Sequence, residues 1–197
     1  MTSPIPIIAL DVPTRADARA LVARVGPAAD FFKVGLQLFT REGPPVVEWL
    51  RGEGKRVFLD LKLHDIPNTV GRAAASAAAL GVELLTVHAV GGEAMLRAAV
   101  DGAREGGAST GILAVTVLTS FDDAAYAAAT LNPGVRAAYA VAQYAAMAAR
   151  AGARGVVCAG AEASAVRREH GAGFGTLVPG LRAAGGATHD QARVATP

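Results

Sequence analysis

The stretch Arg56-Val-Phe-Leu-Asp-Leu-Lys-Leu-His-Asp-Ile-Pro-Asn-Thr69 combines the pattern of a buried strand with a cluster of charged residues. Aliphatic residues occupy alternate positions in its first half, which is the period of a β-strand: Val57, Leu59, Leu61 and Leu63. The opposite face carries Asp60 and, two residues later, Lys62. Because neighbouring opposite charges partly offset the cost of burial, this segment alone fits either a structural ion pair or a functional one.

Strand and helix patterns alternate along the whole chain around this stretch. Strands are predicted at 5–12, 31–36, 56–63, 83–90, 111–119, 155–159 and 175–178. Helices are predicted between them, at 14–25, 44–51, 69–80, 93–105, 122–129, 135–151 and 162–169. Such alternation is typical of repeated βα units around a parallel sheet.

Two architectures fit repeated βα units with right-handed crossovers: a doubly wound sheet and a (β/α)8 barrel. The first strand is followed by Asp11-Val-Pro13, which is not the glycine fingerprint of a dinucleotide-binding sheet. Charged and histidine residues lie toward the carboxyl ends of strands one to four, where barrel enzymes hold their active sites: Asp11, Lys33, Asp60, Lys62 and His88. We therefore predict an α/β fold of the (β/α)8 TIM-barrel type, with residues 1–197 as a single domain. Only seven strands are identifiable, so we also expect the eighth to be absent.

The composition narrows the class of protein. The chain has 197 residues, 52% of them apolar, and a net charge of +2. Its basic residues form no stripe with interleaved aromatics, so no nucleic-acid partner is expected. Its uncharged runs are too short to cross a bilayer, and the N-terminus lacks the basic start of a signal peptide, so we expect a cytoplasmic protein. The lone Cys158 excludes an internal disulfide.

Four charged residues of alternating sign are expected to meet at the rim, which is the edge formed by the carboxyl ends of the strands: Lys33, Asp60, Lys62 and Asp65. A lysine between two carboxylates remains an ammonium and can act as an acid. Such a fixed array favours a reaction in which negative charge moves between neighbouring atoms, and decarboxylation is one. It requires no metal and no organic cofactor.

A magnesium site is the alternative interpretation of the same rim. Asp11, Asp60, Asp65 and His64 offer suitable ligand atoms, but the two lysines would compete with the ion. His64 is out of phase with Asp60, and we interpret it as structural. We interpret His88 as a hydrogen-bonded residue beside the site.

The segment from Phe58 to Thr69 resembles the active-site signature of the orotidine 5'-phosphate decarboxylases, most closely the bacterial type. The resemblance extends through further segments in family order: Ala9–Val12, Lys33–Gly35, Thr86–Ala89, Ala114–Ser120, Gly155–Cys158, Val178–Arg182 and Asp190–Val194. It implies conversion of orotidine 5'-phosphate to UMP in pyrimidine biosynthesis, without a cofactor.

The resemblance also implies roles for the rim residues. Lys62 would protonate C6 of the pyrimidine after carbon dioxide leaves, and Asp60 would repel the substrate carboxylate. Lys33 would hold Asp60 and a ribose hydroxyl, and Asp11 would bind the ribose.

Further implied contacts involve a second subunit and the far ends of the substrate. Asp65, with Ile66 and Thr69, would reach the partner's site in a homodimer. The pyrimidine edge would be read by Thr119 and Ser120, and the phosphate would be held by Arg182 and Gln191.

This sequence departs from the family pattern in three places. Members of the family continue with an eighth strand that ends in a Gly-Arg-Pro segment. That segment binds the substrate phosphate, and this sequence lacks it. Val178 replaces a usual Thr, and His189 a usual Gly. We therefore expect a C-terminally truncated decarboxylase that is weakly active or unstable as it stands.

Two other functions compete with this expectation. A magnesium-dependent phosphosugar lyase or decarboxylase of the same superfamily shares Asp-x-Lys-x-x-Asp, but the segments Ile66–Thr69 and Leu118–Ser120 favour the nucleotide enzyme. A barrel remnant that serves as a binding module is the non-enzymatic alternative, although a decayed site would not need all four rim charges.

Overall fold

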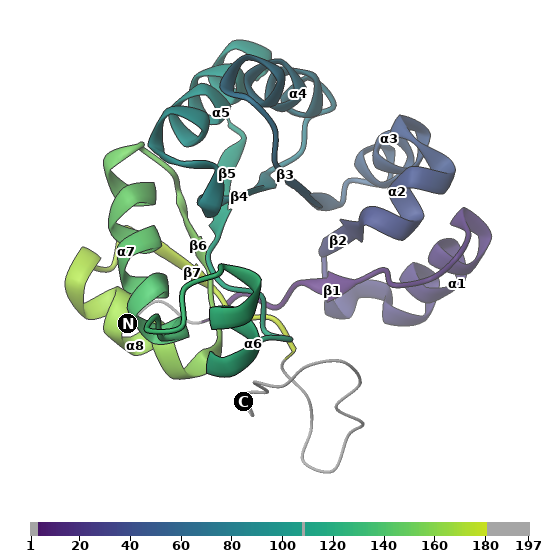
Figure 1. Cartoon of the computed structure of the whole chain (residues 1–197). Helices are drawn as coiled ribbons and strands as arrows, with labels where there is room; N and C mark the ends of the chain where they lie inside the picture. The colour runs from purple at the N-terminus through teal and green to yellow at the C-terminus, as the bar shows by residue number, and fades with distance from the viewer. Residues whose placement is uncertain (1–3, 108, 181–197) are drawn as a thin grey trace.

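The computed structural model describes residues 4–107 and 109–180. Seven strands form one parallel sheet in the order of the sequence, so each strand pairs with its neighbours along the chain. They are β1 (Ile8–Ala9), β2 (Phe31–Gly35), β3 (Arg56–Leu63), β4 (Leu84–His88), β5 (Gly111–Val115), β6 (Gly155–Val157) and β7 (Gly175–Leu177). In Figure 1 the sheet curls with the strands inside and the helices outside. This is the predicted TIM-barrel type of fold, and the described residues contain the seven predicted strands.

Helices follow nearly every strand and return the chain to the start of the next. They are α1 (Arg15–Val25), α2 (Leu36–Glu42), α3 (Pro44–Gly52), α4 (Pro67–Ala79), α5 (Glu93–Gly106), α6 (Asp123–Ala129), α7 (Ala137–Arg150) and α8 (Gly160–His170), with two 3-10 turns at Gly26–Ala28 and Ala89–Gly91. Thr14 caps α1, because its hydroxyl accepts a hydrogen bond from the backbone N–H of Asp17.

Two of the predicted boundaries were wrong around the first two strands. The strand expected over 31–36 ends at Gly35, and Leu36 begins α2, a helix that the sequence analysis missed. The first strand is only two residues long, although Leu10 still donates a backbone hydrogen bond to Lys33 at 3.0 Å. The difference at β2 arises at the carboxyl end of that strand, where the chain leaves the regular ladder beside the candidate site.

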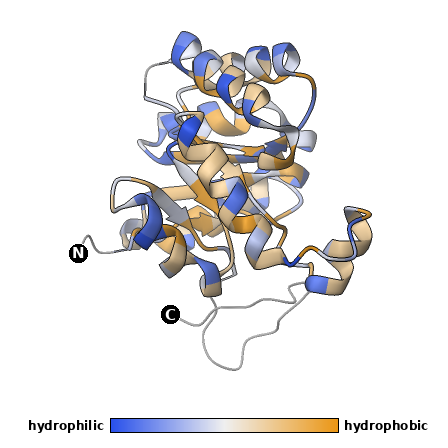
Figure 2. Cartoon of the chain, turned by 60° about the vertical axis from the view of Figure 1, so that its left-hand side comes forward, coloured by the Kyte–Doolittle hydropathy of each residue, from blue (hydrophilic) through white to orange (hydrophobic). Residues whose placement is uncertain are grey.

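The two faces of the sheet bury different groups of side chains. Inside the curl, the side chains of Phe31, Phe58, Leu84 and Leu113 pack together. The other face, with Val57 and Leu59, packs against the helices as part of the main core. In Figure 2 the most hydrophobic colouring lies on the strands enclosed by the helices. The alternation in β3 therefore separates an outer aliphatic face from an inner one that ends in charges.

Helices α4 and α5 pack against each other more closely than ordinary side chains allow. A Cβ placed on Gly102 would overlap the carbonyl oxygen of Gly71, and one on Gly106 would overlap that of Ala75. Because glycine has no side chain, the two backbones touch directly. These helices follow β3 and β4, so their contact holds that pair of strands together.

An ion pair between Arg56 and Glu83 lies at the amino ends of the strands, opposite the rim. The guanidinium of Arg56 donates two hydrogen bonds to the carboxylate of Glu83, at 2.7 and 2.8 Å, and lies 4.2 Å from the ring centroid of Phe31. Bonding to Arg56 lowers the pKa of Glu83, against the opposing effect of burial. This contact stabilises the amino ends of the strands, away from the candidate site.

Candidate active site

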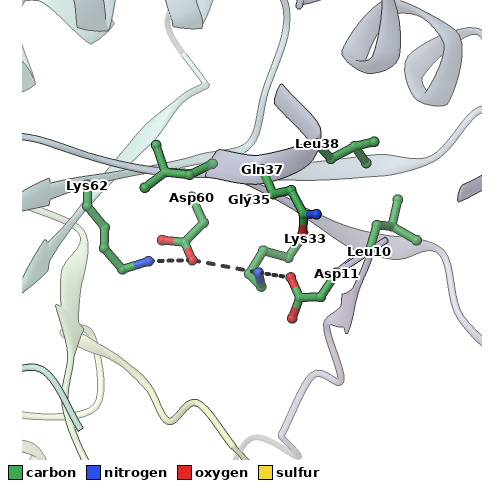
Figure 3. Close-up of a pocket in the computed structure, with 9 residues that line it drawn as sticks. Leu10, Asp11, Lys33, Gly35, Gln37, Leu38, Asp60 and Lys62 are labelled. Atoms are coloured by element: carbon green, nitrogen blue, oxygen red, sulfur yellow. Dashed lines mark hydrogen bonds and ion pairs between the residues drawn. The ribbon is translucent and has the colours of Figure 1, made fainter. Parts of the chain in front are cut away.

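Four side chains of alternating charge lie in a row across the carboxyl ends of the first three strands (Figure 3). The Nζ atom of Lys62 is 2.8 Å from Oδ2 of Asp60, and that oxygen is 3.8 Å from Nζ of Lys33. Lys33 in turn donates a hydrogen bond of 2.8 Å to Asp11. The structure therefore brings together the four charged residues predicted at the ends of strands one to three.

Burial differs strongly along this row. The Asp60 side chain is 13% exposed and Asp11 is 69% exposed, with the two lysines between these values. Two ammonium groups within 4 Å compensate the charge of the buried Asp60 carboxylate, whose desolvation would otherwise be costly. The array is thus a fixed electrostatic feature whose outer end is open to solvent.

The backbone beneath this array departs from regular strand geometry. Lys62 has a φ of 50°, in the left-handed region, which costs a non-glycine residue about 1–3 kcal/mol. Leu59 pairs with Leu85 but Leu63 pairs with Val87, so three residues of β3 stand opposite one residue of β4. A bulge of this kind redirects a side chain next to an active site.

Thr86 of β4 lies opposite the bulge and connects its two charged residues. Its hydroxyl accepts a hydrogen bond of 2.9 Å from the backbone N–H of Lys62. The same hydroxyl donates a hydrogen bond of 2.9 Å to Oδ1 of Asp60, which leaves Oδ2 to face the lysines.

A pocket of about 210 Å³ adjoins the charged row. Leu10, Gly35 and three residues from the start of α2 complete its wall, which consists of Leu10, Asp11, Lys33, Gly35, Leu36, Gln37, Leu38, Asp60 and Lys62. Its volume is below the 300–1,000 Å³ that is typical of sites for whole small ligands. The pocket therefore fits part of a ligand, with the charges along one wall.

His88 ends β4 near the charged row, with its ring centroid 5.9 Å from that of His64. Burial lowers the pKa of His88, and repulsion from His64 and Lys62 lowers it further, against a weaker opposite effect of Asp60. These effects favour the neutral form of the imidazole. Within the described residues it makes no hydrogen bond, so the interpretation of His88 as hydrogen-bonded was wrong there.

The other predicted residues lie apart from the row. Asp65, Ile66 and Thr69 are exposed on the turn after β3 and the start of α4, and Oδ1 of Asp65 accepts a hydrogen bond from the N–H of Ile66. Thr119 and Ser120 form a turn beyond the carboxyl end of β5. Arg182 and Gln191 lie outside the described residues.

The sequence analysis missed two polar residues of this site, Gln37 and Thr86, as well as the apolar part of the pocket wall. Gln37 belongs to the helix that was not predicted. Thr86 stands in an apolar strand, in phase with His88, and a lone polar residue at such a position was the available signal.

Residues 4–107 and 109–180 contain neither a metal-binding cluster nor a membrane-spanning helix. No three His, Cys, Asp or Glu side chains there are arranged to hold a metal ion. No helix in the same part of the chain has the length and apolar character needed to cross a membrane.

Comparison with known proteins gives one consistent family. The model of the orotidine 5'-phosphate decarboxylase / HUMPS family matches residues 4–197. The chain is 54% identical over 189 residues to orotidine 5'-phosphate decarboxylase of Anaeromyxobacter dehalogenans, covering 96% of this chain and 81% of that protein. It is 50% identical over 198 residues to the Thermobifida fusca protein of that name, covering 100% and 82%.

A solved structure agrees with the sequence comparisons. The crystal structure of orotidine 5'-phosphate decarboxylase from Lactobacillus acidophilus superimposes with a TM-score of 0.85 at 37% identity, covering 91% of this chain and 82% of that one. With the family model, the relatives and the fold in agreement, this chain belongs to the orotidine 5'-phosphate decarboxylase / HUMPS family.

Proposed function

We propose that this chain decarboxylates orotidine 5'-phosphate to UMP without a metal or an organic cofactor. The observation that carries the proposal is the Asp60–Lys62 pair, a buried carboxylate held 2.8 Å from an ammonium at the pocket wall. Relatives up to 54% identical that bear this enzyme's name support the choice of substrate.

The proposed reaction uses the two charges in sequence. The substrate carboxylate lies against Asp60, where repulsion between like charges raises the energy of the bound ground state. The bond from C6 to the carboxyl carbon breaks, its electron pair remains on C6, and carbon dioxide leaves. The ammonium of Lys62 stabilises the developing charge and transfers its proton to C6, and the amine regains a proton from solvent.

The remaining rim residues bind and orient the nucleotide. Lys33 lies between the two aspartates, so it holds Asp60 in place and presents a donor to a ribose hydroxyl. Asp11, the most exposed of the row, accepts from the ribose. Thr119 and Ser120 read the pyrimidine edge, while Arg182 and Gln191 contact the phosphate.

The proposal extends to the assembly and to the chain as a whole. We propose a homodimer in which Asp65, Ile66 and Thr69 of one subunit enter the site of the other. It is supported by an Ile66 side chain that is 66% exposed beside an exposed Asp65. We further propose that residues 1–197 act as one domain in the cytoplasm, where charged nucleotides are retained.

The function is tested by incubating purified protein with orotidine 5'-phosphate labelled at the carboxyl carbon. We expect labelled carbon dioxide and UMP in equal amounts, at a rate that EDTA leaves unchanged. Absence of carbon dioxide release from the folded protein would refute the proposal. Loss of activity with EDTA, restored by magnesium, would favour the phosphosugar enzyme's chemistry instead.

Sharing of the site is tested by mixing two inactive variants, Lys62→Ala and Asp65→Asn, after joint unfolding and refolding. In a mixed dimer one site carries both changes and the other carries neither. Because half of the dimers are mixed, about a quarter of the wild-type activity should return. A site built within one subunit predicts no recovery.

A further inference from the structure

The hydroxyl of Thr86 contacts two distinct features of the site. One is the left-handed backbone of Lys62, and the other is the orientation of the Asp60 carboxylate. Thr86 is fully buried in the middle of β4, so water does not replace its hydrogen bonds.

The first contact supports the bulge. Opposite Thr86 the two strands have lost regular register, because three residues of β3 stand against one of β4. The N–H of Lys62 points instead to the Thr86 hydroxyl, 2.9 Å away. A side chain thus provides the acceptor where the strand ladder is irregular, as a buried N–H requires.

The second contact directs the carboxylate. The hydroxyl has one proton, and it donates that proton to Oδ1 of Asp60 at 2.9 Å. With Oδ1 occupied, Oδ2 lies 2.8 Å from Lys62 and 3.8 Å from Lys33. One hydroxyl therefore fixes both the strand position from which Lys62 extends and the oxygen that it meets.

We propose that Thr86 is a positioning residue, whose hydroxyl aligns the Lys62 ammonium and the Asp60 carboxylate for the reaction. This inference rests on the proposed decarboxylation. It predicts that loss of the hydroxyl slows the chemical step while substrate binding remains nearly intact, because Thr86 does not line the pocket.

The main test is the substitution Thr86→Val, which keeps the shape of the side chain and removes the hydroxyl. We expect kcat to fall about 10–100-fold, since small misalignments of reacting groups have effects of that size. KM and the dissociation constant of UMP should stay within about threefold. Thr86→Ser, which keeps the hydroxyl, should stay within about threefold of wild type in kcat.

Thr110→Val is the matched control. Thr110 is another buried threonine, and its hydroxyl donates to the carbonyl of Val82 near the amino ends of the strands. Its loss should leave kcat unchanged. Amide hydrogen exchange in residues 60–63 should accelerate in Thr86→Val and not in Thr110→Val.

A second pair keeps the test decisive if Thr86→Val fails to fold. Thr86→Ser and Thr86→Ala both lack the methyl group and differ by the hydroxyl alone, so Ala should be the slower of the two by about tenfold or more. Equal rates for the pair, or a Thr86→Val enzyme within threefold of wild type, would overturn the role of Thr86. Wild-type protein that releases no carbon dioxide would refute the decarboxylase proposal instead, so the two failures are distinguishable.

Discussion

Lys62 forms its 2.8 Å ion pair with Asp60 from a backbone that has left the β conformation. The two residues lie on one strand with a single residue between them, and the bulge and left-handed φ of Lys62 accompany the approach of their charged groups. A strained backbone conformation of this kind persists only where the surrounding structure fixes it. Here the hydrogen bonds to Thr86 and the packing of β3 against β4 do so.

The role of Lys62 predicts a specific kinetic defect. Lys62→Ala should reduce kcat at least about 1,000-fold, because the proton donor and a charge that stabilises the carbanion are both lost. UMP should still bind within about tenfold of wild type, measured by calorimetry. Lys55→Ala is the control, since Lys55 lies beside Phe32 away from the charged row, and its activity should be unchanged. Full activity of Lys62→Ala would exclude its proposed role.

His88 predicts a pH dependence of stability. Its pKa in the folded protein lies below the ordinary value of 6.5, so the unfolded chain binds the proton first as pH falls. This contribution to stability is present above about pH 6.5 and is lost as pH falls through the lower, folded pKa. Urea unfolding at pH 7.5 and 5.5 should show a smaller loss in His88→Gln than in wild type. Gln143→Ala, at an exposed position of α7 without a titratable group, is the control and should retain the wild-type dependence.

The Arg56–Glu83 pair should affect stability and leave catalysis unaffected. Arg56→Met removes two charge-assisted hydrogen bonds and leaves a half-buried carboxylate unpaired, so the free energy of unfolding should fall by about 1–2 kcal/mol. Arg104→Ala, in an exposed pair with Asp101, should change it by less than about 0.5 kcal/mol. Chemical denaturation gives both values. An altered KM in Arg56→Met would contradict the separation of this end from the site.

The contact of α4 with α5 predicts that added bulk is not tolerated. Gly102→Ala should lower the free energy of unfolding by about 2 kcal/mol or more, because the new methyl group overlaps the backbone at Gly71. Gly52→Ala provides a helix control with open space around the new methyl group, and it should be neutral or stabilising by up to about 1 kcal/mol. Thermal unfolding of both variants measures the difference. Equal stability of the two variants would mean that α4 and α5 can move apart without a loss in the free energy of unfolding.

The sequence predicted the strands, most helices and the charged rim because each has a local signature. Alternation in β3 separates the outer aliphatic face from the inner one, and glycine ends several helices. The helix α2 was missed because Leu36 and Leu38 continue the apolar run of β2, and only the tertiary structure turns the chain at Gly35.

The finer geometry of the site depends on register between strands, which no local pattern contains. Regular spacing of Asp60 and Lys62 indicated an undistorted strand, whereas the structure has a bulge there. The partnership of Thr86 with both residues follows from which residue of β4 stands opposite that bulge. Pairing of Lys33 with Asp11 likewise required the alignment of β1 with β2.

The direct backbone contact of α4 with α5 also determines the order in which the molecule opens. Local unfolding begins where few bonds must break, and β1 is only two residues long, whereas α4, α5, β3 and β4 are joined through backbone, ladder and side-chain contacts. Amide protons of this four-element unit should therefore be the slowest to exchange. Asp60, Lys62 and Thr86 lie within it, so we expect the Asp60–Lys62 ion pair to remain assembled during fluctuations that release β1 and Asp11.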